Sequence, residues 1–214
     1  MTIVPDPATR VEAPEGNVPQ SPVDSRRRKQ IATAVLLTTA AIGAAGGMII
    51  TPVSLFSSSG PALAFPPLYA ALAAVKLLPG VLAQSLIRRP GVALLAMVVV
   101  GLINIPFSTH GPMVFVSLAA VGLLQEIVFA VGLYRVWSWW MHVISNVFVI
   151  VVLAVIGLRA IATPETAPTV MATYWAVAVL SALVIVAVGL LISNAVARTG
   201  VITSIRSNAN TAKK

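Results

Sequence analysis

The sequence predicts an all-α membrane protein, a polytopic bundle of six transmembrane helices with both termini in the cytoplasm. Of its 214 residues, 58% are hydrophobic and only 9% are charged, and the mean hydropathy is +0.95. Soluble domains carry about 25% charged residues, so this chain cannot cover a water-facing surface. Its apolar runs reach roughly 20 residues, the length of a helix that crosses a bilayer and about twice that of a membrane barrel strand.

Six apolar runs define the expected elements. We expect helices over residues 31–50, 67–87, 92–105, 113–133, 139–158 and 169–197, within a transmembrane domain that covers 30–198. Residues 1–29 are predicted to form a disordered tail that ends in a basic cluster, since they are polar and rich in proline. Residues 51–66 hold prolines and a run of serines, which is typical of an external loop, and 199–214 are expected to form a cytoplasmic tail.

Basic residues mark one set of helix ends. On this topology these ends carry Arg26, Arg27, Arg28, Lys29, Arg88, Arg89, Arg135, Arg198, Arg206, Lys213 and Lys214, and the other ends carry only Arg159. Since cytoplasmic flanks of membrane helices are rich in Lys and Arg, the basic ends are predicted to face the cytoplasm. Trp137, Trp139 and Trp140 are then expected to form an aromatic belt at that face.

Composition excludes several classes of function. The chain has no cysteine, two histidines and six acidic residues, so we expect neither a disulfide framework nor a metal centre. It contains no Gly-rich phosphate loop, nucleophile elbow or HExxH run, so we expect no enzyme activity, no ATP hydrolysis and no cofactor. The net charge of +8 comes largely from residues that flank apolar runs, which indicates the lipid bilayer, and not nucleic acid, as the partner.

Two charged residues lie inside predicted membrane helices, Lys76 in the second and Glu126 in the fourth. A charge at such depth costs a few kcal/mol, so each marks a functional-site hypothesis. At about 1.5 Å per residue, Lys76 would lie about 13 Å and Glu126 about 20 Å from the outer surface. Three alternatives stay open: a structural ion pair, an outward-opening pocket anchored by Glu126, or a proton relay. Pro79-Gly80 after Lys76 predicts a kink, because proline lacks a backbone donor.

Other polar and aromatic side chains are candidates to line such a pocket. Gln125 neighbours the carboxylate, Asn104 and His110 flank the end of the third helix, and Tyr69 and Trp175 lie near outer helix ends. The substrate-binding candidates are therefore Glu126, Gln125, Tyr69, Asn104, His110, Lys76 and Trp175. Several also have an ordinary explanation, since loop histidines are usually solvated and aromatic residues concentrate at membrane interfaces.

The first helix is rich in small residues at four-residue spacing. The pairs are Ala40/Ala44, Ala41/Ala45 and Gly43/Gly47. In lipid, where no hydrophobic force joins helices, such pairs allow two backbones to approach closely. They predict either packing within this protein or docking on another membrane subunit.

Four segments resemble one family. Ile87-Arg-Arg-Pro-Gly-Val-Ala-Leu94 is similar to the IRKPGAAL run of YkoE-type substrate-binding (S) components of energy-coupling-factor (ECF) vitamin transporters. Gly111-Pro-Met-Val114 and Gly122-Leu-Leu-Gln-Glu-Ile-Val-Phe129 are similar to the family's GPM and GLGAExVF segments, and Ala197-Arg-Thr-Gly-Val201 is similar to its AYTGV segment. The four segments occur in the family's order.

The resemblance implies a multi-pass protein of a prokaryotic cell membrane that binds thiamin or its hydroxymethylpyrimidine precursor. It also implies a membrane T component and cytoplasmic ATPases as partners, with docking through Ala40, Ala41, Gly43, Ala44, Ala45 and Gly47. Of the family's acidic positions only Glu126 is matched, while Met97 stands at another and Lys76 is an additional base. A neutral pyrimidine or another small metabolite therefore stays open as the substrate. The alternatives to an importer subunit are a stand-alone secondary transporter and a structural subunit without a ligand.

Overall fold

The computed structural model describes residues 22–109, 111–135, 137–161 and 167–198. The elements in chain order are α1 (Pro22–Ser57), α2 (Gly60–Ala64), α3 (Pro66–Val75), α4 (Leu78–Ile87), α5 (Val92–Asn104), the 3-10 helix η1 (Ile105–Phe107), α6 (Met113–Val131), α7 (Trp139–Ile161) and α8 (Pro168–Arg198). Every one of these elements is helical, so the predicted all-α class is confirmed for this part of the chain.

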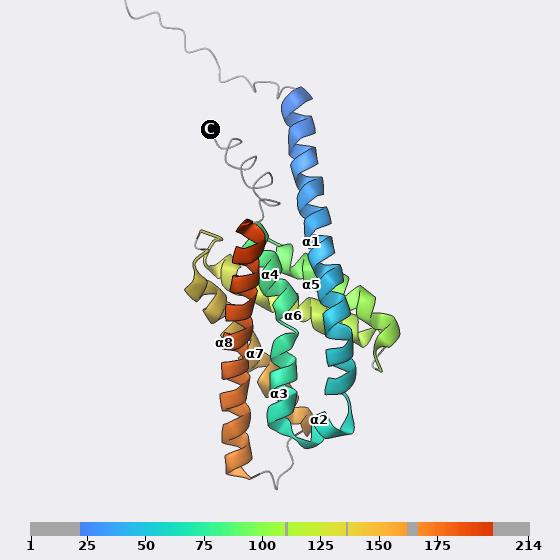
Figure 1. Ribbon diagram of the computed structural model, residues 1–214, viewed down its shortest axis with the longest axis vertical. Helices are drawn as coiled ribbons and strands as arrows, with labels where there is room; N and C mark the ends of the chain where they lie inside the picture. Colours follow the sequence, from blue (N-terminus) through green and yellow to red (C-terminus); the bar gives the residue numbers. More distant parts are fainter. Residues whose placement is uncertain (1–21, 110, 136, 162–166, 199–214) are drawn as a thin grey trace, which may run out of the picture.

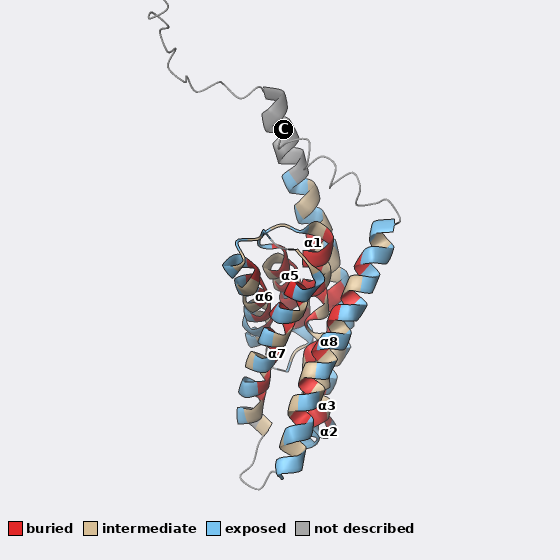
Figure 2. Ribbon diagram, turned by 90° about the vertical axis from the view of Figure 1, so that its left-hand side faces the viewer, coloured by how far each residue is buried: buried red, intermediate tan, exposed pale blue. Residues whose placement is uncertain are grey.

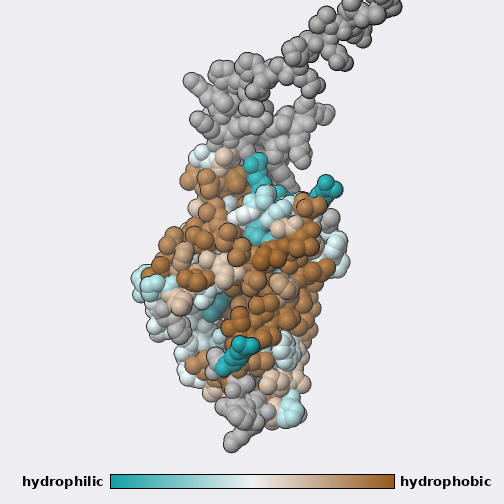
Figure 3. All heavy atoms as spheres, turned by 180° about the vertical axis from the view of Figure 1, so that it is seen from behind, coloured by the Kyte–Doolittle hydropathy of each residue, from teal (hydrophilic) through white to brown (hydrophobic). Residues whose placement is uncertain are grey.

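The described helices provide five segments that are long and apolar enough to cross a membrane. They are Ala32–Ser57, Pro66–Ile87, Met113–Val131, Trp139–Arg159 and Pro168–Arg198. A further apolar segment, Val92–Phe107, is shorter. Apolar side chains cover the middle of the molecule in the view of Figure 3. The chain is thus a multi-pass membrane bundle, whereas six spans and two cytoplasmic termini stay predictions.

The helices run in two main directions (Figure 1). The helices α1, α3, α4 and α8 follow the long axis of the molecule, and α5 and α6 form a hairpin that crosses them obliquely. The start of α1, the α4–α5 turn and the end of α8 lie toward one end of that axis. We call it the basic end, because Arg88, Arg89 and Arg198 lie there, and we call the opposite end, which holds α2 and the end of α7, the distal end. This arrangement agrees with the predicted orientation.

The start of α1 differs from the prediction. The helix begins at Pro22, so residues 22–29 of the predicted tail are helical, and residues 1–21 lie outside the described part of the chain. A continuous helix through the basic cluster requires no burial, since Arg and Lys are good helix formers. The predicted tail at 199–214 also lies outside the described residues.

The end of α1 differs as well, because most of the predicted loop at 51–66 is helical. The helix continues through Pro52 to Ser57, and α2 follows. A proline removes one backbone donor, which the helix tolerates here. The Thr51 hydroxyl donates to the Gly47 carbonyl at 2.8 Å, and the Ser57 and Ser58 hydroxyls donate to the Ser54 carbonyl, so side chains bond to the backbone over the last turns.

The kink predicted at Pro79 is a short break in the helix, since α3 ends and α4 begins just before this proline. Pro79 lacks the N–H that would bond to the carbonyl four residues earlier. The chain turns instead through bonds of three-residue spacing, from Lys76 N to Ala73 O (3.2 Å) and from Leu77 N to Ala74 O (3.0 Å). The break therefore leaves Lys76 and Leu77 between the two helices, in the middle of a membrane segment.

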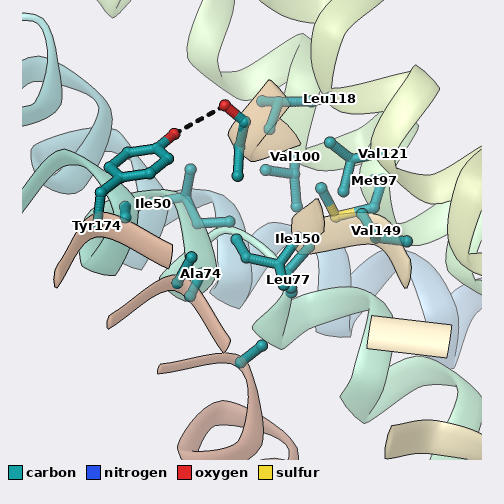
Figure 4. Packing of buried hydrophobic residues seen from close by; sticks show 14 residues of the cluster. Ile50, Ala74, Leu77, Met97, Val100, Leu118, Val121, Val149, Ile150 and Tyr174 are labelled. Atoms are coloured by element: carbon teal, nitrogen blue, oxygen red, sulfur yellow. Dashed lines mark hydrogen bonds between the residues drawn. The ribbon is translucent and has the colours of Figure 1, made fainter. Parts of the chain in front are cut away.

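The core is apolar and joins residues of α1, α3, α5, α6, α7 and α8 (Figure 4). Met97 and Tyr174 are among its largest fully buried side chains, and the Tyr174 hydroxyl donates to the Ala154 carbonyl at 2.9 Å. The helix α8 contributes small residues at four-residue spacing, including Ala178 and Ala182, which lets it pack closely. Its other side carries exposed residues along its whole length (Figure 2).

Candidate functional site

Glu126 lies near the end of α6 and binds the start of α5. Its side chain is only 5% exposed. Its Oε1 accepts a hydrogen bond from the Ala93 backbone N–H at 2.8 Å, and its Oε2 accepts one from the Tyr134 hydroxyl at 3.0 Å. Ala93 is in the first turn of α5, and its N-cap residue, Gly91, has no side chain to cap it. Because helix N-termini carry partial positive charge, α5 stabilises the carboxylate, and the carboxylate caps α5.

Tyr134 belongs to the α6–α7 connection, which has an unusual backbone. Leu133 and Tyr134 both have positive φ (50° and 52°), a conformation that costs about 1–2 kcal/mol per non-glycine residue. Tyr134 N donates to Phe129 O at 2.9 Å, and Trp137 Nε1 donates to Tyr134 O at 2.8 Å. Burial first, and then the charge and hydrogen bond of Glu126, raise the pKa of Tyr134 to about 12. The carboxylate thus holds this connection and α5 together.

Lys76 binds a different helix end. Its Nζ donates to the Ser57 hydroxyl at 3.1 Å, and Ser57 is the last residue of α1. Helix C-termini carry partial negative charge, so this position favours an ammonium group. The ion pair between Lys76 and Glu126, one of the three alternatives left open by the sequence, is not formed: each charge lies at a different helix end.

Gln125 connects the helix break to α7. Its Nε2 donates to Leu77 O (3.1 Å), which the break brings close, and to Asn146 Oδ1 (2.9 Å). The Ser145 hydroxyl donates to the Gln125 carbonyl at 3.0 Å. A Cβ at Gly80 would lie 2.7 Å from Gln125 Cδ and even closer to its Oε1, so only glycine leaves room for the carboxamide. The sequence singled out Gln125 only as the neighbour of Glu126 and a candidate pocket residue, and did not predict these partners.

Three fully or almost fully buried side chains in this region have polar atoms without a partner among the described residues. They are both amide atoms of Gln84, Oε1 of Gln125 and Nδ1 of His142. At about 100° per residue, Gln84 projects from α4 between Leu77 and Gly80, the two residues that contact Gln125. Sequence reasoning missed Gln84 and His142 as candidates. The signal for His142 was its four-residue spacing from Asn146 within an apolar run.

Aromatic side chains gather nearer the distal end. A Cβ on Gly157 of α7 would lie 2.9 Å from Tyr69 Cε1 and 3.0 Å from the Tyr174 hydroxyl oxygen, so these two rings converge there. The rings of Tyr174 and Trp175 meet edge to face, with centroids 5.9 Å apart. We call Tyr69, Tyr174 and Trp175 the distal aromatic cluster. It brings together two predicted site residues from α3 and α8.

Two other predicted site residues do not join this cluster. Asn104 is buried in the last turn of α5, and its Nδ2 donates to the Val100 carbonyl of its own helix at 2.9 Å. His110 lies outside the described residues.

The small residues of α1 divide into two sets. A Cβ on Gly43 would lie 2.7 Å from Ala96 O, and one on Gly47 would lie 3.0 Å from Ile103 Cδ1, so both glycines pack against α5. The prediction that these two dock on a partner is corrected by their burial inside the protein. Ala41 and Ala45 are exposed, and Ala40 and Ala44 are partly exposed.

An apolar cavity of about 210 Å³ adjoins this second set. It lies between α1, α4 and α8 and is lined by residues such as Ala45, Gly46, Pro79, Leu82 and Ile192. None of the predicted substrate-binding residues lines it.

The comparisons with known proteins agree with this architecture. A family model described as "ABC-type cobalt transport system, permease component" matches residues 35–152, more than half of the chain, and the protein belongs to that family. A solved structure described as the crystal structure of an S-component of an ECF transporter is similar with a TM-score of 0.67 and 20% sequence identity. The similarity covers 84% of this chain and 92% of that one, so the protein has the S-component fold. No curated protein matches.

The family's description mentions cobalt, which His, Cys and carboxylate side chains would ligate. Among the side chains that the structure describes, no three or more His, Cys, Asp or Glu residues gather in one place.

Proposed function

We propose that this protein is the substrate-binding S component of an energy-coupling-factor importer for thiamin or a precursor such as hydroxymethylpyrimidine. The observation that carries the proposal is the S-component fold, shared over 84% of the chain. The family supports it, since its description is that of a permease component of an ABC-type transport system. The four sequence segments that resemble vitamin-specific S components favour this class of substrate.

The distal aromatic cluster supports a site for a flat, ring-containing substrate. Within this cluster the partly exposed rings of Tyr69 and Trp175 offer stacking faces, and small-molecule sites combine such faces with a few placed polar groups. Lys76 lies in the helix break at the end of α3, and Gln125 of α6 contacts the same break. In this proposal both supply the polar groups of the site. In this proposal the substrate enters from the distal end, which the predicted orientation places outside the cell. Glu126 acts on the scaffold and does not touch the substrate.

The exposed face of α1 is the proposed docking surface for a membrane T component. Ala41 and Ala45 lie on this face, and Leu37 and Met48, which are 67% and 74% exposed, flank them. Small residues allow a partner helix to approach closely, and exposed large side chains supply contact area. Cytoplasmic ATPases bound to the T component would then supply the energy for transport.

Co-expression with a T component and its ATPases tests the proposal. The expected result is a stable complex and ATP-dependent uptake of radiolabelled hydroxymethylpyrimidine or thiamin into vesicles. A complex with a catalytically inactive ATPase is the matched control and should show no uptake. Failure to form any complex would contradict the proposal.

A stand-alone secondary transporter is the second candidate, favoured by the two charges placed inside membrane segments. Uptake that persists without ATPases and collapses with the proton gradient would establish it instead.

A further inference from the structure

We propose that Lys76, with Ser54 and Ser57, forms a binding site for an anionic group, a carboxylate or phosphate, on the transported solute. This inference rests on the proposed function, and within its class of thiamin precursors it narrows the substrate to a pyrimidine with an anionic substituent, in place of thiamin and the free alcohol. It predicts that a solute with a negatively charged substituent is preferred to a neutral or cationic one.

The first argument is the unused hydrogen-bonding capacity of Lys76. An ammonium group has three donors. The Nζ of Lys76 has one hydrogen-bond partner among the described residues, the Ser57 hydroxyl at 3.1 Å. Two donors are therefore directed at no acceptor of the described protein, at a site inside a membrane segment where unsatisfied donors are costly.

The second argument is the distribution of negative charge. Glu126 is the only acidic residue whose side chain the structure describes. Both of its oxygens are occupied, by Ala93 N and by the Tyr134 hydroxyl, at the start of α5. Within the described side chains, no carboxylate neutralises Lys76, and a charge buried in a membrane is normally paired.

The third argument is an unpartnered hydroxyl on the same side of α1. The Ser57 hydroxyl donates to Ser54 O at 2.9 Å, so it accepts from Lys76 and has no proton left to donate. The Ser54 Oγ is buried and has no partner within the described structure. Ser54 and Ser57 are three residues apart, so they lie on one face of α1. An anion that accepts from Lys76 and from the Ser54 hydroxyl satisfies both.

The fourth argument is the position of this site relative to the distal aromatic cluster. Tyr69 lies in α3 and Lys76 directly follows that helix; the two are seven residues apart, about two helical turns, so they project from the same side with about 10 Å of rise between them. Side chains lean toward the N-terminus of their helix, so the lysine stem extends from the break toward Tyr69 and shortens that gap. A ring stacked in the cluster can therefore place one substituent on Lys76.

The test is a set of matched probes that differ in charge. Binding to the full-length protein in detergent is measured by calorimetry for 4-amino-5-hydroxymethyl-2-methylpyrimidine, for 4-amino-2-methylpyrimidine-5-carboxylate and for thiamin. The carboxylate should bind at least 10-fold more tightly than the neutral alcohol and than cationic thiamin. Lys76→Gln should remove this preference and Lys76→Arg should keep most of it. Arg159→Gln, which removes an exposed basic residue at the distal end, is the matched control and should leave it unchanged.

A second measurement needs no variant. Pyridoxal phosphate, an anionic aldehyde, is added to the wild-type protein, and the imine is reduced with borohydride before peptide mass spectrometry. Lys76 should be labelled, and the pyrimidine carboxylate should protect it. The proposal is overturned if the wild type does not bind the carboxylate or does not prefer it. It is also overturned if Lys76→Gln keeps that preference, or if pyridoxal phosphate leaves Lys76 unlabelled. None of these results depends on partner subunits, so they are distinguishable from a failure of the importer assay.

Discussion

Replacing Glu126 by glutamine tests whether this carboxylate stabilises the scaffold or binds the solute. Glutamine keeps the shape, and its Oε1 can still accept from Ala93 N while its Nε2 donates to the Tyr134 oxygen. The change therefore removes charge but few contacts. Hydrogen bonds to charged groups contribute about 1.5–3 kcal/mol and neutral ones about 0.5–1.5 kcal/mol. The substitution therefore weakens two hydrogen bonds and removes the attraction between the carboxylate and the α5 N-terminus. Since desolvation of the carboxylate is also relieved, we expect a net loss of about 1–2 kcal/mol.

The assay combines thermal unfolding with solute binding. A loss of this size corresponds to a decrease in Tm of roughly 2–8 °C for a chain of this length. Glu126→Leu should be worse, by about 3 kcal/mol or more, because it leaves the Ala93 amide and the Tyr134 hydroxyl, both donors, without an acceptor. The dissociation constant for the solute should be unchanged in Glu126→Gln. Unchanged stability together with a tenfold weaker affinity would refute the structural role and restore Glu126 as a solute anchor.

Three further predictions follow from the contacts around the helix break and the α6–α7 connection. Because its pKa is raised to about 12, Tyr134 contributes stability that is full below pH 10 and is lost as the pH rises toward 12, so Tyr134→Phe should flatten thermal stability over that window. Gly80→Ala should destabilise the protein by about 1–3 kcal/mol in thermal unfolding, because the new Cβ displaces the Gln125 carboxamide. Gly60→Ala is the control and should be tolerated, since Gly60 has open space around it, and equal Tm values for the two variants would contradict this packing. Gln84→Leu should leave stability unchanged or raise it by about 1–3 kcal/mol, since both amide atoms lack a partner in the described chain, and a clear loss would reveal a bound water or solute there.

Local features were predictable from the sequence. The break at Pro79 follows from one missing backbone donor, which is a local property of proline. The bounds of α5 at Val92–Asn104 and of α8 at Pro168–Arg198 agree closely with the predicted helices, because Gly and Pro or a change in polarity flank each run. Between Pro52 and Ser57 the same reasoning failed, since hydroxyl side chains and packing kept α1 helical through loop-type residues.

The placement of the site could be predicted only in part. The depth of a residue along a helix can be counted from the sequence, and Glu126 lies, as counted, toward the C-terminal end of α6. Which neighbour it faces depends on how the helices are rotated and tilted, and the α5–α6 hairpin crosses the others obliquely (Figure 1). Because α5 and α6 run antiparallel in this hairpin, the start of α5 lies beside the carboxylate near the end of α6. Lys76 lies at the end of α1 and Glu126 at the start of α5, and these two positions also depend on the tertiary structure.

The most direct test is a structure of the full-length protein with the pyrimidine carboxylate bound. We predict that the ring lies in the distal aromatic cluster and that its carboxylate accepts from Lys76 Nζ, with Glu126 still bonded to Ala93 and Tyr134. A ligand found beside Glu126, or one with no contact to Lys76, would contradict the account.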